Sequence, residues 1–227
     1  CATHLRSDTL FDPCPSKGLP AHPRTDLHCP DISEISGQHL GRRALEISAA
    51  GGHSLLMIGP PGCGKTMLAE RLPGILPEMS VTEALHCAMI HSVSSSGFDI
   101  DRWKVRPFRA PHHSASAAAL IGGGRNAQPG EISLAHNGVL FLDELPEFQR
   151  QTLDQLREPL ESGFISISRV NASVRYPCQF QWISAMNPCR CGYEGDLSGR
   201  CRCTVEEAKR YRQKISGPLQ DRIGLQV

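Results

Sequence analysis

A glycine-rich segment that ends in Lys65 and Thr66 has the residue types and the spacing of a loop that binds nucleoside triphosphates. The segment reads GPPGCGKT and fits the pattern G-x-x-x-x-G-K-[ST]. Its glycines let backbone N–H groups approach an anion closely, the lysine ammonium can lie against the β- and γ-phosphates, and the threonine hydroxyl can ligate Mg²⁺. We therefore predict that ATP and Mg²⁺ bind at Gly59, Pro60, Pro61, Gly62, Cys63, Gly64, Lys65 and Thr66.

The context of this segment argues against a glycine-rich turn that matches the pattern by chance. The apolar run at residues 55–58 precedes it and is typical of a buried strand. A helix is expected to begin near Lys65, because Leu68 and Leu72 continue at helical spacing until Pro73 interrupts them. A strand, the loop and a helix, in this order, are the setting that the motif requires.

A pair of acidic residues, Asp143 and Glu144, follows a second apolar run at residues 138–142. The run is typical of a central parallel strand, and open α/β sheets bind ligands at the carboxyl ends of such strands. Asp143 would hold Mg²⁺ opposite the loop threonine, and Glu144 would polarise the attacking water as a general base. The alternative is that both carboxylates only cap the next helix in solvent.

The segments after this pair are predicted to form a hairpin and a further strand. Alternation of apolar and polar residues from Gly163 to Tyr176 indicates a hairpin with its tip near residues 169–171. The stretch from Phe180 to Asn187 is typical of a strand that ends in a polar residue. The Asn187 amide could hydrogen-bond the γ-phosphate or the hydrolytic water.

Two close cysteine pairs bracket a glycine-rich loop at residues 189–203. Four thiolates match a closed, tetrahedral, structural Zn²⁺ site, although C-x-C is tighter than the usual C-x₂-C spacing. The alternatives are two reduced dithiols, a redox pair or an iron–sulfur cluster. We favour zinc because the loop has no other core to order it. The ligands would be Cys189, Cys191, Cys201 and Cys203.

Other local patterns mark helix starts and an irregular region. Ser80 with Glu83, and Thr204 with Glu207, form capping boxes that predict helices toward Val93 and Ile215. Gly217 and Pro218 are expected to stop the second of these helices. Residues 102–130 show low periodicity, which is more often functional than idle inside a compact domain.

Composition narrows the class of protein. The formal net charge is +1, so that bulk electrostatics gives no case for a nucleic-acid or membrane partner. No stretch approaches the roughly 20 consecutive apolar residues of a membrane span, and the first residues lack a secretion signal, so we expect a cytoplasmic protein. Residues 1–30 are rich in proline, histidine and cysteine and are predicted to be a linker or tail. We expect the chain to be a fragment of a longer protein.

The order of these motifs resembles that of ring-forming AAA+ ATPases, and in particular the magnesium-chelatase-like group that includes the ComM and YifB proteins. The resemblance covers residues 31–227 and implies an α/β fold: a P-loop NTPase three-layer αβα sandwich with a parallel sheet, here one ATPase core with the zinc loop as an appendage. The cysteine loop makes the match more specific than a phosphate loop alone. The matching residues are 31–38, 59–66, 106–124, 129–138, 138–144, 187–193 and 216–222.

Several roles follow from the resemblance only. Asn187 resembles the sensor residue of the strand between the two ATP-site strands. Arg222 resembles the finger that reaches the γ-phosphate in a neighbouring subunit, which implies a homo-oligomeric ring, expected to be a hexamer. Arg125, Arg169 and Asn171 lie where related helicases carry pore-facing loops, and are candidates for gripping a DNA backbone. The alternative for these three is that they are solvated loop tips.

The sequence also departs from the family pattern. Gly224 stands where the family usually carries an Asp after the finger Arg-Ile. The helical lid with its second sensor arginine, and the amino-terminal domain that resembles the Lon protease fold, have no counterpart in this sequence. On that basis we expect the chain to bind nucleotide more readily than it turns it over.

The function that the resemblance implies is that of an ATP-hydrolysing motor core in a DNA branch-migration helicase, acting on recombination intermediates during natural transformation. One alternative is a chelatase motor that drives metal insertion into a porphyrin, although the cysteine loop is foreign to that subunit as the family is usually described. Another alternative is a chaperone-like remodeller of a protein partner. The signature Gly-Ala-Phe-Thr-Gly-Ala of one such group is absent from the sequence.

Overall fold

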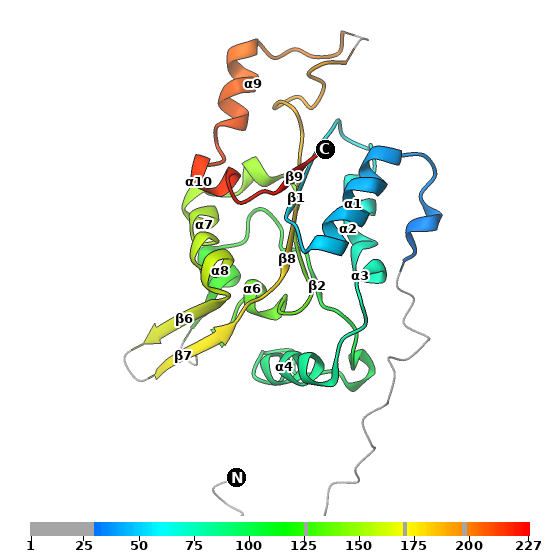
Figure 1. Ribbon diagram of the computed structural model, residues 1–227. Coiled ribbons are helices and arrows are strands. Elements are labelled where there is room, and N and C mark those ends of the chain that lie inside the picture. Colours follow the sequence, from blue (N-terminus) through cyan, green and yellow to red (C-terminus); the bar gives the residue numbers. More distant parts are fainter. Residues whose placement is uncertain (1–29, 125–126, 170–171, 197–198) are drawn as a thin grey trace, which may run out of the picture.

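A five-stranded parallel sheet forms the centre of the chain (Figure 1). The computed structural model describes residues 30–124, 127–169, 172–196 and 199–227. The sheet order is β2-β5-β8-β1-β9, so that β8 lies between β1 and β5. The strands are β1 (Leu55–Ile58), β2 (Phe108–Arg109), β5 (Val139–Leu142), β8 (Gln181–Met186) and β9 (Leu225–Gln226).

Helices cover both faces of this sheet, as the ribbon in Figure 1 shows. Among the described residues, three short 3₁₀ helices accompany them: η2 (Ile32–Glu34), η3 (Ile100–Arg102) and η4 (Leu145–Glu147). The helices are α1 (His39–Gly51), α2 (Lys65–Glu70), α3 (Leu72–Ile75), α4 (Val81–Ser92), α5 (Ala117–Ile121), α6 (Glu131–Leu134), α7 (Arg150–Asp154), α8 (Arg157–Ser162), α9 (Val205–Arg212) and α10 (Gly217–Gln220).

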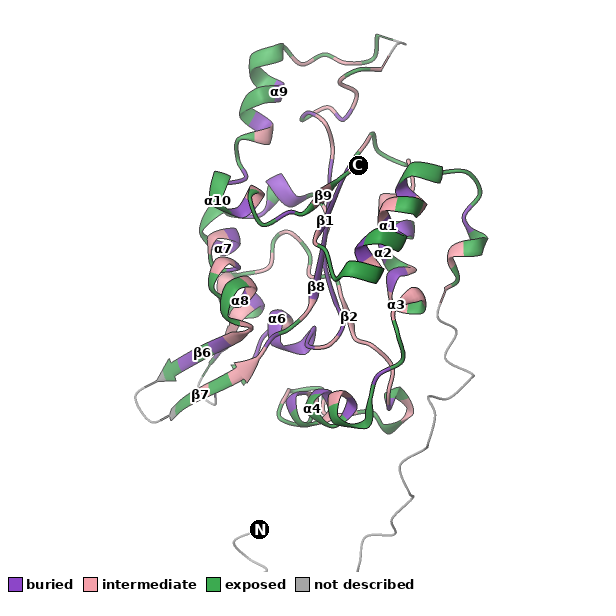
Figure 2. Cartoon of the chain, in the orientation of Figure 1, coloured by how far each residue is buried: buried purple, intermediate pink, exposed green. Residues whose placement is uncertain are grey.

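Alternation along the central strands divides the interior into two cores. Phe141 and Ile183 face one core, which α1, α2 and α3 cover with Leu45, Leu68 and Leu72. Their neighbours in sequence face the second core, which α5, α6 and elements after β5 cover; its members include Leu120, Ile132, Leu140, Leu142, Trp182, Leu153, Leu156, Tyr211 and Leu219. Figure 2 shows the strands as the buried centre between helices that are exposed on their outer sides. Because both faces of the sheet are covered, the strands β1 and β5 are apolar throughout. The predicted three-layer αβα sandwich is confirmed.

The register of the sheet aligns the three segments that carry the predicted site. Ile58 pairs with Met186, and Leu142 pairs with Ser184. Since β1, β5 and β8 are parallel, the residues that follow them emerge at one edge. The phosphate loop, the acidic pair and Asn187 therefore share that edge.

Most local predictions are confirmed. The capping boxes at Ser80 and Thr204 are formed and begin α4 and α9. The hairpin is present as β6 (Phe164–Arg169) and β7 (Ala172–Pro177), paired antiparallel. The helical stripe is interrupted as expected: α2 ends at Glu70, and Pro73 stands in the first turn of α3.

Two local predictions need correction. Residues 102–130 are not uniformly irregular: they include β2, α5 and a small antiparallel pair, β3 (Gly122–Gly123) with β4 (Gln128–Pro129). These elements are too short to leave a periodic pattern in the sequence. Gly217 and Pro218 do more than stop a helix, because they open α10, where proline is tolerated in the first turn.

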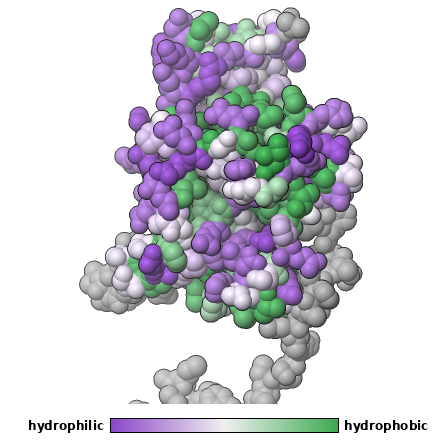
Figure 3. All heavy atoms as spheres, in the orientation of Figure 1, coloured by the Kyte–Doolittle hydropathy of each residue, from purple (hydrophilic) through white to green (hydrophobic). Residues whose placement is uncertain are grey.

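The surface drawn in Figure 3 is hydrophilic over α9 and more hydrophobic around α1. On α1, Leu40 is 79% exposed and Ile47 is 40% exposed. In the described part of the chain, no helix has the length and apolar character that crossing a bilayer requires.

Candidate functional site

The predicted phosphate loop connects β1 directly to α2. Gly62 and Gly64 have φ angles of +76° and +89°, a left-handed conformation that glycine adopts without steric cost. Gly64 is the N-cap of α2, so that Lys65 is the first helical residue. The Lys65 ammonium donates to the carbonyls of Gly59 at 2.7 Å and Pro60 at 3.0 Å, which curls the side chain back over the loop.

Lys65 also links the loop to the strand between β1 and β5. Its Nζ donates to Oδ1 of Asn187 at 3.2 Å. Asn187 is the residue directly after β8, and the last four residues of β8 pair with the whole of β1. The structure thus brings Asn187 to the phosphate loop, as the sequence predicts.

Thr66 and Asp143 meet across the same edge of the sheet. The Thr66 hydroxyl donates to Oδ2 of Asp143 at 2.7 Å, and Oδ1 of Asp143 accepts the backbone N–H of Glu144 at 2.9 Å. An alcohol and a carboxylate oxygen are the hard donors that Mg²⁺ prefers. With Mg–O distances of about 2.1 Å, adjacent ligands of an octahedron lie about 3 Å apart. The pair therefore fits a Mg²⁺ ion with little movement.

Glu144 stands beside this pair and contacts a residue that the sequence analysis did not single out. Its backbone is left-handed, with φ of +52°, which is uncommon for a residue other than glycine. Its carboxylate Oε2 lies 3.0 Å from Nδ1 of His113, and its side chain is 51% exposed. His113 in turn packs against His112, with ring centroids 4.0 Å apart and the ring planes tilted by 35°. Two adjacent histidines in an irregular segment give no pattern from which this contact could be predicted.

Lys65, Thr66, Asp143, Glu144 and Asn187 line one cavity of about 390 Å³ at the carboxyl edge of the sheet. A larger cavity of about 740 Å³ lies between α4 and the β6–β7 hairpin, but the described residues that line it include no acid and no lysine. Of these two cavities, as the described residues line them, the first combines backbone of the glycine loop with charged side chains. Its lining residues are Pro61, Gly62, Gly64, Lys65, Thr66, Met67, Asp143, Glu144, Met186 and Asn187.

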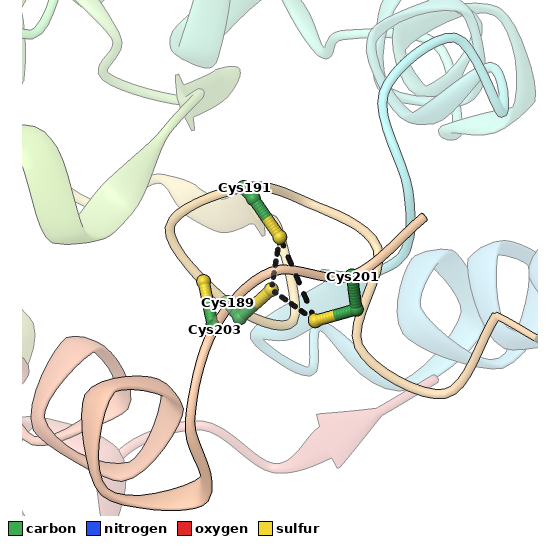
Figure 4. A group of neighbouring side chains, drawn as sticks. All are labelled: Cys189, Cys191, Cys201 and Cys203. Carbon is green, nitrogen blue, oxygen red and sulfur yellow. Dashed lines mark hydrogen bonds between the residues drawn. The ribbon is translucent and has the colours of Figure 1, made fainter. Parts of the chain in front are cut away.

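The four cysteines of the predicted metal loop converge as a separate cluster (Figure 4). The Sγ atom of Cys189 lies 3.3 Å from that of Cys191 and 3.8 Å from that of Cys201, and Cys191 lies 3.6 Å from Cys201. The sulfur of Cys203 completes a group whose members are all within 4.8 Å of one another. Four sulfurs at about 2.3 Å from a tetrahedral Zn²⁺ would be about 3.8 Å apart. The cluster therefore has the size of such a site.

The chemistry of the cluster also suits a metal. Backbone hydrogen bonds from Arg202 and Tyr193, and a side-chain hydrogen bond from Cys189, lower the pKa of the Cys191 thiol to about 6, whereas the thiol hydrogen bond to Cys191 and burial raise the pKa of the Cys203 thiol to about 11. A thiolate is the form that binds zinc. Cys178, which is buried outside the cluster, has a thiol pKa raised to about 12 by burial.

Arg222 lies away from the cavity of its own chain. The hydroxyl of Ser54 donates to the Arg222 carbonyl at 2.8 Å, and Ser54 precedes β1. The phosphate loop follows the other end of β1, about 13 Å away for four residues of strand. The Arg222 guanidinium pairs with Glu161 on α8 and does not line the cavity.

The three residues predicted to contact DNA are only partly placed. Arg125 and Asn171 lie outside the described residues. Arg169 is the last residue of β6, at the end of the hairpin that projects from the body of the fold (Figure 1). On that hairpin, the Arg175 guanidinium stacks 4.0 Å from the ring centroid of Phe164.

Comparison with known proteins agrees with the sequence resemblance. Residues 31–227 match the family model described as magnesium chelatase, subunit ChlI. The chain is 57% identical over 198 residues to the protein YifB of Salmonella typhimurium and 54% identical over 198 residues to the competence protein ComM of Haemophilus influenzae. Each alignment covers 87% of this chain but 38% of the relative, so the chain spans less than half the length of these relatives.

Solved structures show the same fold at low sequence identity. NtrX of Brucella abortus, solved in complex with ATP, superposes with a TM-score of 0.53 over 86% of this chain and 38% of the NtrX chain. The sequence identity is 18%, so that this likeness bears on the fold alone.

Proposed function

Because this chain belongs to the magnesium chelatase ChlI family of AAA+ ATPases, within its ComM and YifB group, we propose that it is the ATP-hydrolysing core of a ring-shaped DNA branch-migration motor. The observation that carries the ATPase part is the convergence of Lys65, Thr66, Asp143, Glu144 and Asn187 around one cavity. These side chains come from three parallel strands and the loops that follow them. They supply the charge that a triphosphate and its metal need.

Each residue of the site has a separate task in this proposal. Lys65 turns from the Gly59 and Pro60 carbonyls to the β- and γ-phosphates. Thr66 and Asp143 hold Mg²⁺, which when bound neutralises charge on the phosphates. Asn187 is within reach of Lys65 at 3.2 Å and orients either the γ-phosphate or the water that attacks it.

Glu144 is the proposed general base, and His113 is proposed to position it. The carboxylate is half exposed and can reach a water molecule in the cavity, while Nδ1 of His113 lies 3.0 Å from Oε2. A hydrogen bond from this nitrogen would hold one oxygen of Glu144 and leave the other for the water. A general base of this kind typically raises the reaction rate by a factor of about 10²–10⁴.

Arg222 is proposed to act on the site of a neighbouring subunit. Its carbonyl is tied to Ser54 at the amino end of β1, opposite the phosphate loop of its own chain. An arginine in that place serves a nucleotide only across an interface, where it stabilises charge on the transferred phosphoryl group. The proposal therefore includes a ring, with six subunits as the expected number, and the exposed apolar residues of α1 offer surface for association.

DNA is the proposed partner of the ring, and the β6–β7 hairpin is its proposed contact. The hairpin projects from the core and includes Arg169 and Arg175. It follows α8, the helix whose Glu161 pairs with Arg222. We propose that Arg125, Arg169 and Asn171 grip the phosphate backbone. An ATP-driven DNA motor works where both ATP and DNA are present, so the proposal includes a cytoplasmic location.

The cysteine cluster is proposed to bind one structural Zn²⁺. All four positions would be taken by the thiolates of Cys189, Cys191, Cys201 and Cys203, so the ion would have no open position for catalysis. The zinc would stabilise the loop between β8 and α9. It would not contact the reacting groups during hydrolysis.

The test of this function is ATP hydrolysis by the whole protein with different DNA structures. A four-way junction is expected to stimulate turnover more than the same mass of linear duplex, and Glu144→Gln is the matched inactive control. Stimulation by a porphyrin or by a protein partner, with none by DNA, would instead support the second candidate, a chelatase-type motor. That candidate is favoured by the description of the family model that matches the chain.

A further inference from the structure

We propose that the cysteine cluster controls the phosphate loop, so that zinc binding and ATP binding strengthen each other. This inference rests on the proposed ATP and zinc sites and adds a coupling between them. It is carried by a direct contact between the two loops. The contact involves Gly192, which follows the ligand Cys191, and Pro61 in the phosphate loop.

The contact is close enough that the two loops must move together. A Cβ atom built on Gly192 would lie 2.7 Å from Cδ and 2.8 Å from Cγ of Pro61, and 3.8 Å from Cγ of Asn187. A real Cβ would not fit at the first two distances. The Gly192 backbone therefore packs against the proline ring, and it takes a left-handed conformation to do so, with φ of +87°.

A second link runs through the backbone from the metal site to Asn187. Only Pro188 separates Asn187 from the buried ligand Cys189. The N–H of Gly192 donates to the Cys189 carbonyl at 3.0 Å and closes a turn that includes both ligands of the first pair. The Asn187 side chain accepts from Lys65 at 3.2 Å. The short segment from Asn187 to Gly192 thus contacts the phosphate loop at Lys65 and at Pro61.

The cluster joins the two halves of this loop, together with the ion pair between Arg200 and Asp196 at 2.7 Å and the Arg200 guanidinium over the Tyr193 ring. Among the described residues from 190 to 203, only Gly192 is buried. On the side toward α9, Arg212 donates to the Pro188 carbonyl at 3.1 Å and pairs with Glu194. A metal that joins the two cysteine pairs would fix the turn against Pro61, because a loop without an apolar core takes its order from its ligands.

The coupling is reciprocal by thermodynamic necessity. If bound zinc raises the affinity for ATP by some factor, bound ATP raises the affinity for zinc by the same factor. Couplings between distinct sites are typically about 5-fold to 150-fold. We expect roughly a tenfold effect here, since the contact bears on the phosphate loop without replacing any of its ligands.

The test compares two glycine-to-alanine variants of the 227-residue chain. Gly192→Ala places a methyl group against Pro61. Gly195→Ala is the matched control, because Gly195 is in the same loop and is also left-handed, with φ of +81°, but a Cβ there meets nothing within 4 Å. Zinc content is measured by metal analysis, and MgATP affinity by calorimetric titration.

We expect both variants to keep one zinc per chain, Gly192→Ala to bind MgATP roughly tenfold more weakly than the unmodified chain, and Gly195→Ala to bind it unchanged. Removing zinc from the unmodified chain with a chelator should weaken MgATP binding similarly. In Pro61→Ala, which deletes the contact from the other side, MgATP affinity should no longer respond to zinc removal. The unmodified chain should also bind zinc roughly tenfold more tightly when MgATP is present.

Equal MgATP affinities in the two glycine variants, or no change on zinc removal, would overturn the coupling while leaving the proposed function intact. A chain that takes up no zinc refutes the proposed zinc site, and one that binds no MgATP refutes the proposed ATPase; either result removes the coupling as well. The two kinds of failure are therefore distinguishable.

Discussion

The hydroxyl of Thr66 donates a 2.7 Å hydrogen bond to the carboxylate of Asp143, although 77 positions separate the two residues in the sequence. The contact joins the phosphate loop after β1 to the acidic pair after β5. It exists because β8 holds both strands in a parallel register. Two oxygen donors at this separation are what one Mg²⁺ ion needs from the protein in a nucleotide site.

Replacing Asp143 should therefore change the dependence on metal more than the affinity for the nucleotide itself. In Asp143→Asn, we expect ATP to bind about equally well without Mg²⁺, but the gain in affinity on adding Mg²⁺ to fall roughly tenfold or more. Titrating ATP with and without Mg²⁺ measures both quantities. An unchanged gain from Mg²⁺ in this variant would show that Asp143 does not bear on the metal.

Glu144→Gln separates binding from hydrolysis. The amide keeps the size of the side chain but cannot accept a proton from water, so we expect MgATP affinity within about twofold of the unmodified protein and turnover lower by about 10²–10⁴. Phosphate release by the whole protein measures the turnover. If Glu144→Gln turned over at the normal rate, another group would have to be the base.

Removing one ligand of the cysteine cluster should release the metal. Cys201→Ser is expected to lower the zinc content from about one per chain to near zero and to make the loop before α9 sensitive to proteolysis. Cys178→Ala is the control, because Cys178 is buried outside the cluster. Metal analysis of the two variants decides the matter, and zinc retained at full stoichiometry in Cys201→Ser would speak against a four-cysteine site.

His136 should make the stability of the folded chain sensitive to mild acid. Burial, with a smaller contribution from His86, lowers the pKa of His136 to about 4, whereas the unfolded chain has the ordinary value of 6.5. Between pH 6.5 and pH 4 the unfolded chain therefore binds a proton at His136 that the folded chain does not bind. The contribution of neutral His136 to the free energy of unfolding is full above pH 6.5 and is lost as the pH falls toward 4. Between pH 7.5 and 5 the loss is about 2 kcal/mol, at about 1.36 kcal/mol per pH unit below 6.5.

Denaturant unfolding at the two pH values measures this loss. His136→Gln removes the titrating group and should show a smaller fall in stability between pH 7.5 and 5 than the unmodified chain. His39→Gln, on the exposed start of α1, should behave like the unmodified chain. Identical pH dependence in all three proteins would exclude His136 as the cause.

Much of this architecture could be predicted because its signals are local. β1 and β5 are short apolar runs next to Gly59 and Asp143, and the capping box at Ser80 lies within four residues. The cysteine cluster could be predicted because metal chemistry restricts both residue type and spacing. In each case neighbouring residues carry the information.

The features that escaped prediction depend on contacts between distant segments. β2 and β9 are two residues long, and only pairing at the edges of the sheet defines them. His113 reaches Glu144 from a segment without periodicity, and Gly192 reaches Pro61 from one loop to another. No pattern of hydrophobicity marks such contacts, since neither partner belongs to a regular element.

The binding of MgATP to this chain tests the central claim most directly. Calorimetric titration of the unmodified chain should give saturable binding of one nucleotide, and Lys65→Ala should weaken it by roughly 100-fold, because an ammonium that contacts two phosphates is lost. Arg43→Ala, on the exposed face of α1, should leave the affinity unchanged. Equal affinity in Lys65→Ala and the unmodified chain, or no binding by either, would contradict the account.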